Sequence, residues 1–322
     1  MKKNLMMVLL AASLMVGLSA CGAEEKPAEP TNTESKAETE NKAPEETVAF
    51  EDTSYMVDAD WLKENLDKVQ ILDARGVDAY GQGHIPSAIP VMWQQFSMME
   101  GKPGESSEWG TVLQAEALSK ALSAIGLSAD KDIIVYAGAQ KGWGEEGRIV
   151  WMLHRAGFTK AKILDGGLQY WESKGYETTK EITPLVPTEV KVAALSSETN
   201  IDTKSLKEKL DQVTIIDVRE ADEYAGATKY GEARGGHLPG AINIPFVDFI
   251  NADGRLKTAA EIQKILDEKG IKKDAEIVTY CTAGIRSAHM QIVLEMLGYQ
   301  QAKNYDDSFY AWAGNPDLPL EK

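Results

Sequence analysis

The sequence predicts an α/β protein made of two tandem domains, each a parallel β-sheet with helices on both faces. Two observations predict this fold. Short runs that are almost continuously apolar alternate with amphipathic stretches, which is the pattern of parallel strands covered by helices on both sides. The pattern also occurs twice, because Asp73 and Tyr136 recur as Asp217 and Tyr280, each 144 residues further along the chain.

Three pairs of similar segments make up this repeat. The first copy contains VQILDARGVDAYGQGHIPSAIPV, KDIIVYAGAQ and KILDGGLQYWESKGY, at 69–91, 131–140 and 162–176. The second copy contains VTIIDVREADEYAGATKYGEARGGHLPGAINIPF, AEIVTYCTAG and KNYDDSFYAWAGNPD, at 213–246, 275–284 and 303–317. The period is far longer than the unit of a solenoid repeat, so it indicates duplication of a whole domain.

Each copy contains three apolar runs that we expect to be strands. They lie at 70–74, 132–137 and 161–166 in the first copy and at 214–218, 276–281 and 302–306 in the second. Helical spacing is evident at 115–126 and 259–270, where Gly126 and Gly270 follow the last apolar position and can supply the C-cap. Strands that alternate with helices imply parallel sheets with right-handed crossovers.

The N-terminus has the pattern of a targeting segment. Lys2 and Lys3 precede the apolar stretch LMMVLLAASLMVGLSA, which is shorter than the roughly 20 residues of a membrane-spanning helix. Its ending, LSAC, resembles the lipobox of bacterial lipoproteins. That resemblance implies cleavage before Cys21 and lipidation of its sulfur, so that lipid would anchor the protein to a membrane of the cell envelope on the extracytoplasmic side. The alternative is an ordinary signal peptide cut nearby, with Cys21 incidental.

The composition changes sharply after the targeting segment. The stretch GAEEKPAEPTNTESKAETENKAPEE has no aromatic residue and too little apolar surface to order itself. The segment ITPLVPTEVKV, near 182–192, separates the two copies of the repeat. We therefore expect four parts: a lipoprotein signal peptide at 1–20, a disordered acidic tether at 21–50, an N-terminal domain at 51–182 and a C-terminal domain at 183–322.

Charge and cysteine content limit the classes of function. The 322-residue chain has a formal net charge of -16, which argues against nucleic acid as a partner because phosphate binding needs a basic face. Small anionic substrates stay open, since a few local arginines can oppose the overall sign. Of the two cysteines, a lipidated Cys21 would leave Cys281 as the single thiol of the mature protein, and no intramolecular disulfide could form.

Cys281 stands where chemistry is expected in a parallel sheet, at the carboxyl end of a strand. Thr282, Ala283, Gly284 and Ile285 separate it from Arg286, where helical spacing begins and continues to residue 298. A tight loop that enters a helix directs N–H groups and the positive helix end toward the sulfur, and both favour a thiolate. Arg286 adds a fixed positive charge with donors for an oxyanion.

The cysteine loop, the two D-x-R … G-H-[IL]-P segments and the duplicated layout together resemble the rhodanese family of tandem-domain sulfurtransferases, over residues 51–322. The resemblance implies that Cys281 takes a sulfane sulfur from a small anionic donor, thiosulfate first, and passes it from a persulfide to cyanide or a thiol. It also implies that the backbone of 282–286 holds the persulfide, that Arg286 binds the donor, and that Arg234 is a second substrate-binding arginine. No cofactor is expected.

Three alternatives to this function stay open. Related phosphatases have the loop C-x5-R, whereas this chain has C-x4-R, and the shorter loop fits a sulfur atom better than a phosphate or an arsenate. A second alternative is a membrane-anchored persulfide carrier or sensor with little turnover. The third is a different donor, 3-mercaptopyruvate, because Thr282–Ala283 matches neither the thiosulfate pattern nor the mercaptopyruvate pattern of the family.

The first copy lacks the nucleophile. Aligning Tyr136 with Tyr280 places Ala137 at the position of Cys281, and the loop that follows is longer and carries two glutamates. We expect this domain to be inactive, to pack against the active one and to help wall its cleft. Trp93 or Trp143 would line that wall, unless each is only a packing residue.

Several polar residues are expected to be structural. His84 and His237 occupy the same turn in both copies, and Asp73 and Asp217 are expected to pair with Arg75 and Arg219. His289 follows Arg286 in the helix, and a general-base role for it is the less favoured reading. No His, Cys or carboxylate groups fall at metal-ligand spacing, so no metal is expected. Asp307 replaces a glycine of the family's D-G-S segment, so that turn is expected to differ.

Overall fold

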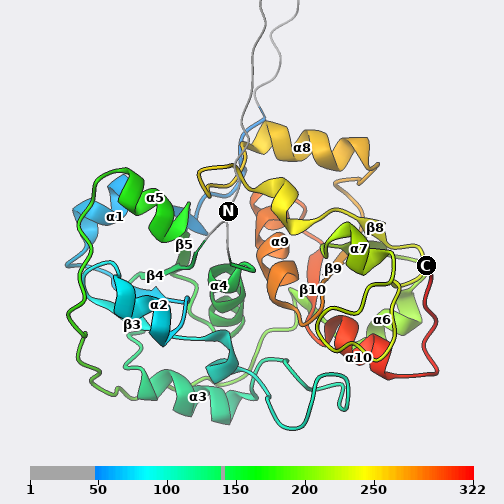
Figure 1. Cartoon of the computed structure of the whole chain (residues 1–322), viewed down its shortest axis with the longest axis horizontal. Helices are drawn as coiled ribbons and strands as arrows, with labels where there is room; N and C mark the ends of the chain where they lie inside the picture. The colour runs from blue at the N-terminus through cyan, green and yellow to red at the C-terminus, as the bar shows by residue number, and fades with distance from the viewer. Residues whose placement is uncertain (1–47, 139–141) are drawn as a thin grey trace, which may run out of the picture. The chain divides into compact units, whose positions relative to one another are not determined.

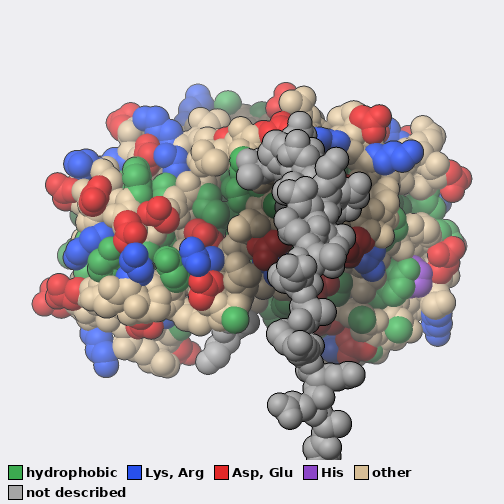
Figure 2. All heavy atoms as spheres, turned by 90° about the horizontal axis from the view of Figure 1, so that it is seen from above, with side chains coloured by type: hydrophobic (Ala, Val, Ile, Leu, Met, Phe, Trp, Pro, Cys, Tyr) green, Lys and Arg blue, Asp and Glu red, His purple; other side chains and the backbone are tan. Residues whose placement is uncertain are grey.

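The computed structural model describes residues 48–138 and 142–322. The expected signal peptide, nearly all of the expected tether, and Cys21 therefore lie outside the described residues. Within the described part of the chain, no helix is long and apolar enough to span a membrane. Where that part is visible on the face in Figure 2, acidic and basic side chains are intermixed.

Each half of the described chain forms one five-stranded parallel sheet, as the sequence predicted. The first sheet has the order β1-β5-β4-β2-β3 and the second the order β6-β10-β9-β7-β8. The strands of the first are β1 (Met56–Val57), β2 (Gln70–Asp73), β3 (Ala88–Pro90), β4 (Ile133–Tyr136) and β5 (Ala161–Leu164). Those of the second are β6 (Asn200–Ile201), β7 (Thr214–Asp217), β8 (Ile242–Asn243), β9 (Ile277–Tyr280) and β10 (Ala302–Tyr305).

Helices cover both faces of each sheet. In the first domain these are α1 (Ala59–Asn65), α2 (Val77–Gln82), α3 (Ala115–Ala124), α4 (Glu145–Arg155) and α5 (Gly167–Ser173). In the second they are α6 (Thr203–Lys209), α7 (Ala221–Tyr224), α8 (Ala259–Glu268), α9 (Ile285–Met296) and α10 (Ser308–Gly314). Short 3₁₀ helices, η1 (Trp93–Phe96) and η2 (Phe246–Phe249), follow β3 and β8.

Alternation along the strands divides each core in two. In β4, Ile133 and Val135 pack with α3 and α4, whereas Ile134 and Tyr136 pack with α1, α2 and α5. The second sheet repeats this arrangement, with α8 and α9 on one face and α6 and α10 on the other. Near-continuous apolar runs were therefore the correct signal for strands buried on both faces.

The two domains meet where α4 and α9 lie side by side, between the two sheets (Figure 1). Ala288, Ile292 and Met296 of α9 belong to the hydrophobic core that α4 forms with the first sheet. Gly147 of α4 permits this close approach, because a Cβ atom there would lie 2.5 Å from the Cβ of His289. The tandem domains therefore share one apolar interface.

The segments that flank the domains also pack against them. Phe50, which the sequence analysis placed in the tether, packs against the cores of both domains. Val190 and Val192, in the linker between the domains, are buried in the core of the first. The Ser119 hydroxyl accepts a hydrogen bond from the Val192 N–H at 2.9 Å. The linker after the first domain is therefore held along that domain's surface.

Candidate active site

Cys281 lies directly after β9, in a loop that leads into α9. Gly284 caps this helix with a φ of 77°, in the left-handed region that favours glycine. A Cβ atom at Gly284 would lie 2.8 Å from the carbonyl oxygen of Asp306. Thr282, Ala283 and Ile285, the other residues predicted for the loop, are buried with it. The structure therefore brings together the predicted nucleophile, the tight loop and the helix start, as expected.

The start of α10 holds the cysteine loop in place. The Ser308 hydroxyl accepts a hydrogen bond from the Cys281 N–H at 3.0 Å and donates one to the Cys281 carbonyl at 2.8 Å. Ser308 has a φ of 57°, as Gly167 has a φ of 53° at the matching place in the first domain. Asp307 keeps an ordinary helical φ of -59°. The turn therefore bears its left-handed residue at Ser308, and Asp307 needs no glycine-like angle.

The Cys281 side chain is buried, and its surroundings favour the thiolate. Burial raises the pKa of the thiol, but the positive charge of Arg286 and the N–H groups of Ser287 and Ala283 outweigh it. The pKa of Cys281 is therefore lower than that of an ordinary cysteine. A lower pKa increases the fraction of thiolate, which is the nucleophilic form of cysteine.

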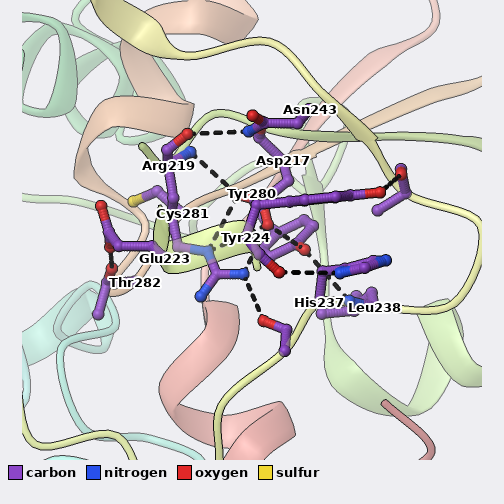
Figure 3. Close-up of polar contacts among 12 residues, drawn as sticks. Asp217, Arg219, Glu223, Tyr224, His237, Leu238, Asn243, Tyr280, Cys281 and Thr282 are labelled. Carbon is purple, nitrogen blue, oxygen red and sulfur yellow. Dashed lines mark hydrogen bonds and ion pairs between the residues drawn. The ribbon is translucent and has the colours of Figure 1, made fainter. Parts of the chain in front are cut away.

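Arg286 does not stand alone beside the sulfur. Its guanidinium donates to both carboxylate oxygens of Glu223, at 2.8 and 3.0 Å, and to the Thr282 hydroxyl oxygen at 2.9 Å. The Thr282 hydroxyl donates in turn to Glu223 at 2.9 Å, and Figure 3 shows these two residues beside Cys281. Burial raises the pKa of Glu223, but the hydrogen bonds and charge of Arg286 outweigh it, so the pKa is lowered.

Glu223 is a site residue that sequence reasoning missed. It lies in α7, and the position matching it in the repeat is Ala79, in the first domain. A glutamate that occurs only in the repeat copy that contains the cysteine was the signal that could have identified this residue. Its charge offsets that of Arg286, so the site is less positive than the loop sequence alone suggests.

The Cys281 loop forms one wall of a cavity of about 100 Å³. Aromatic rings form most of the remaining wall, and both domains contribute them. The first domain supplies Trp93, Trp109 and Trp143, and the second supplies Tyr230 and Tyr310. Both tryptophans named from the sequence therefore line the cavity, and the first domain does wall the cleft.

A model of the rhodanese-like domain matches this chain twice, at residues 58–174 and 202–315. The chain belongs to the rhodanese family. Its relatives include the sulfur carrier protein TtuD of Thermus thermophilus, 29% identical over 287 residues, which span 83% of this chain and 96% of that protein. A candidate thiosulfate sulfurtransferase of Saccharopolyspora erythraea is 30% identical, over 83% of this chain and 95% of its own length. The family supports sulfur transfer as the general activity.

The solved structures support the fold. An anaerobic ergothioneine biosynthesis enzyme of Chlorobium limicola, solved with trimethyl histidine, superimposes with a TM-score of 0.76. It is 23% identical, and the match covers 85% of this chain and 71% of that one. The tandem arrangement of rhodanese-like domains is therefore that of a known fold.

The first rhodanese-like domain keeps the framework of the site without the nucleophile. Tyr136 and Tyr280 each donate a hydrogen bond to the aspartate opposite them on the neighbouring strand, Asp73 or Asp217, at 2.7 and 2.5 Å. Ala137 accepts a hydrogen bond from the N–H of Leu168, as Cys281 does from that of Phe309. Ala137 thus occupies the place that Cys281 has in the second domain. Residues 139–141 of the loop that follows lie outside the described residues.

The predicted aspartate–arginine pairs are confirmed. Asp73 pairs with Arg75 and Asp217 with Arg219, each with a shortest distance of 2.6 Å. Figure 3 shows the hydrogen bonds between Arg219 and Asp217, with Cys281 nearby. These buried pairs position the strand ends from which the loops start.

Arg234 is not brought to the cavity. Its guanidinium donates hydrogen bonds to the carbonyls of Ala313, Leu318, Trp312 and Asn315, at the end of α10 and just beyond it, at 2.6 to 3.0 Å. These four bonds occupy the side chain in a structural contact. The placement gives no support to a second substrate-binding arginine at this position.

The histidines serve the framework. His84 and His237 stack on Tyr80 and Tyr224 and bond to the carbonyls of the same tyrosines, which confirms their structural role. His289 lies in the α4–α9 interface, with Nδ1 3.4 Å from Glu146 Oε1, and is not among the residues that line the cavity. Among the described residues, no group of three or more His, Cys, Asp or Glu side chains could hold a metal ion.

Proposed function

We propose that this protein transfers the sulfane sulfur of thiosulfate to a thiol or cyanide through a persulfide on Cys281. One observation carries the proposal: the Cys281 thiol has a lowered pKa and lines a cavity together with Arg286. A thiolate there can act as a nucleophile, and the cavity gives a small sulfur compound access to it. The relatives named for thiosulfate sulfur transfer support the same donor.

The reaction needs no outside oxidant or reductant. The Cys281 thiolate attacks the outer sulfur of thiosulfate, a new S–S bond forms, and sulfite leaves with the electron pair of the broken S–S bond. The acceptor thiolate or cyanide then attacks the outer sulfur of the persulfide. This step breaks the bond to Cys281, regenerates its thiolate and releases an acceptor persulfide or thiocyanate.

The residues of the loop have separate roles in this proposal. The N–H groups of Ala283 and Ser287 stabilise negative charge on the Cys281 sulfur, and would do the same for the persulfide. Arg286 lies near enough to lower the pKa of Cys281 and to attract the sulfonate of the donor. Glu223 fixes the guanidinium in place and moderates its charge.

A second candidate is a persulfide carrier with little turnover on small acceptors. The name of one relative, a sulfur carrier protein, favours it. In that case the sulfur on Cys281 would pass to a partner instead of cyanide. 3-Mercaptopyruvate is the alternative donor for either activity.

The test uses the purified full chain beside Cys281→Ala and Cys281→Ser. Thiocyanate is measured after mixing with thiosulfate and cyanide, and intact mass is recorded before and after thiosulfate alone. We expect the wild type to gain one sulfur atom and to form thiocyanate, and both variants to do neither. Added sulfur without thiocyanate would favour the carrier. The absence of both would overturn thiosulfate as the donor, and 3-mercaptopyruvate would then be assayed in the same way.

We also propose that Cys21 carries lipid and anchors the protein on the extracytoplasmic side of a bacterial membrane. The support is the LSAC sequence after the apolar stretch, followed by the acidic tether. Cys21→Ala is compared with wild type by phase partition in detergent and by mass of the N-terminal peptide. A mature wild-type protein that begins before or after Cys21, or carries no acyl chains, would overturn the anchor.

A further inference from the structure

The 225–236 loop distinguishes the second domain from the first and lies beside the Cys281 cavity. Asp73 and His84 are 11 residues apart in the first domain, whereas the matching Asp217 and His237 are 20 apart. The extra residues follow α7. The four hydrogen bonds of Arg234 fix the loop to the end of α10, and the Tyr310 hydroxyl donates to the Tyr230 carbonyl at 2.8 Å. The loop is therefore held firmly as part of the cavity wall.

The loop and the first domain together surround the cavity with aromatic rings at steep angles to one another. Trp109 of the first domain meets Tyr310 at 5.2 Å between ring centroids and 87° between planes. Trp143 of the first domain meets Tyr230 at 5.3 Å and 68°. The Trp143 and Tyr230 side chains are 45% and 37% exposed, so their rings are available to a ligand. Such an arrangement of ring faces attracts organic cations.

A buried carboxylate adds negative charge behind this wall. Glu232 is only 6% exposed, and its Oε2 accepts a hydrogen bond from the Tyr230 N–H at 2.8 Å. Its Oε1 is buried and has no hydrogen-bond partner within the described part of the chain. Because Tyr230 lines the cavity, the hydrogen bond from its N–H places Glu232 behind that part of the wall. A buried carboxylate oxygen without a partner is costly and calls for an explanation.

The Tyr230 side of the cavity therefore favours a cation, whereas Arg286 is the group that attracts the anionic donor. Arg286 is the one cationic side chain among the described residues that line it, and the carboxylate of Glu223 offsets part of that charge. The Cys281 thiolate or persulfide and Glu232 are both negative. A further positive charge within the aromatic wall would be stabilised by the ring faces and by Glu232.

We infer that the sulfur acceptor is a small thiol whose organic group is a cation, such as a quaternary ammonium, held by the aromatic wall beside Glu232. This inference rests on the proposed persulfide of Cys281. The thiolate of the acceptor attacks the outer sulfur of the persulfide, and a new S–S bond forms. The Cys281 thiolate leaves with the electron pair of the broken bond. The sequence predicted only that the acceptor is cyanide or a thiol. The cavity wall favours a cationic thiol within that class.

Binding is tested first, because it does not depend on sulfur transfer. Choline and its uncharged isostere 3,3-dimethyl-1-butanol are titrated into the full chain, and tryptophan fluorescence is followed. We expect choline to bind about tenfold more tightly, as a cation held by aromatic rings should. Glu232→Gln, which keeps the size of the side chain but removes its charge, should reduce that preference. Trp143→Leu, which stays apolar but removes the aromatic ring, should reduce it as well. Glu268→Gln, which removes an exposed charge from α8, serves as the matched control.

Transfer is tested second, with three thiols of equal chain length. Thiocholine, 2-mercaptoethanol and 2-mercaptoethanesulfonate are mixed with the preformed persulfide, and the loss of sulfur from Cys281 is followed by mass at equal thiolate concentration. We expect thiocholine to react fastest and the sulfonate slowest, with the ratio compressed about tenfold in Glu232→Gln. Equal transfer rates for the three thiols would overturn the inference, and so would a rate ratio that does not change in Glu232→Gln. Neither result would contradict the proposed persulfide on Cys281. Preferential choline binding without any persulfide would instead overturn the proposed function, and with it the role of the cation as acceptor.

Discussion

Glu223 and Arg286 form a buried two-pronged ion pair next to Cys281, with Nη1–Oε2 and Nη2–Oε1 distances of 2.8 and 3.0 Å. The two residues are 63 positions apart in the sequence and come from α7 and the first turn of α9. The pair fixes the guanidinium but also weakens its field at the sulfur. The balance between these effects can be measured by removing the negative charge alone.

Glu223→Gln should make Cys281 more reactive at acid pH. The amide keeps the size of the side chain but removes the charge that offsets Arg286, so the pKa of the Cys281 thiol should fall further. Alkylation by iodoacetamide near pH 6 should become about tenfold faster, and the KM for thiosulfate should fall. Asp222→Asn, on the same helix but exposed, is the control. Slower alkylation in Glu223→Gln would show that fixing Arg286 matters more than its net charge.

Substitutions at Ser308 should separate backbone strain from hydrogen bonding. Ser308→Ala keeps the left-handed φ and loses both bonds to Cys281, so it should lower the free energy of unfolding by about 1–3 kcal/mol. Ser308→Gly loses the same bonds but relieves the backbone, so it should be more stable than the alanine variant by about 1 kcal/mol. Urea denaturation measures both. Persulfide formation should slow in each, and equal stability of the two variants would contradict the strain argument.

Arg148 should matter for activity although it belongs to the first domain, which lacks the cysteine. Its guanidinium pairs with Asp306 and donates to the carbonyls of Gly284 at 3.3 Å and Gly110 at 3.0 Å. Arg148→Met leaves a buried carboxylate without this partner and should cost about 3–5 kcal/mol of stability. It should also slow persulfide formation, because the cysteine loop loses a support.

The control for Arg148 is Arg155→Met, in the same helix. Arg155 is 3.6 Å from Asp306 but its hydrogen bond goes to Ser196, outside the catalytic loop. Both variants are assayed below their melting temperatures. If Arg148→Met then formed the persulfide at the wild-type rate, the first domain would have no part in holding the loop.

Glu145 should make stability depend on pH. Burial and the nearby charge of Glu146 raise the pKa of its carboxyl from 4.5 to about 7. The folded state therefore binds more protons than the unfolded state, and this contribution to stability is present below about pH 4.5 and is lost as pH rises through about 7. The amide of Glu145→Gln does not titrate. The free energy of unfolding of the variant, relative to that of the wild type, should therefore rise by up to about 3 kcal/mol between pH 4.5 and pH 8. Urea denaturation across this range tests it, and a constant difference would contradict it.

The sequence alone was sufficient for the framework. Two kinds of feature depend only on neighbours within a few residues: the apolar runs of the buried strands, and the glycines that end helices, Gly126 and Gly270. The repeat depends on one constant offset, which relates Asp73 to Asp217. The nucleophile was equally visible, because the strand end, the tight loop and Arg286 are contiguous in the sequence.

The tertiary structure decided what surrounds the sulfur. Arg234 was assigned to substrate and instead holds a loop, Glu223 was overlooked, and the cavity takes rings from both domains. Such contacts join side chains that are tens to hundreds of residues apart, and they form only when β-sheet order and helix packing bring them within a few ångströms. Local patterns record which elements a segment forms, whereas the partner of a charged or aromatic side chain is set by packing between elements. The sequence therefore determined the fold and the proposed reacting atom, and the folded chain determined the charge and the walls of the site.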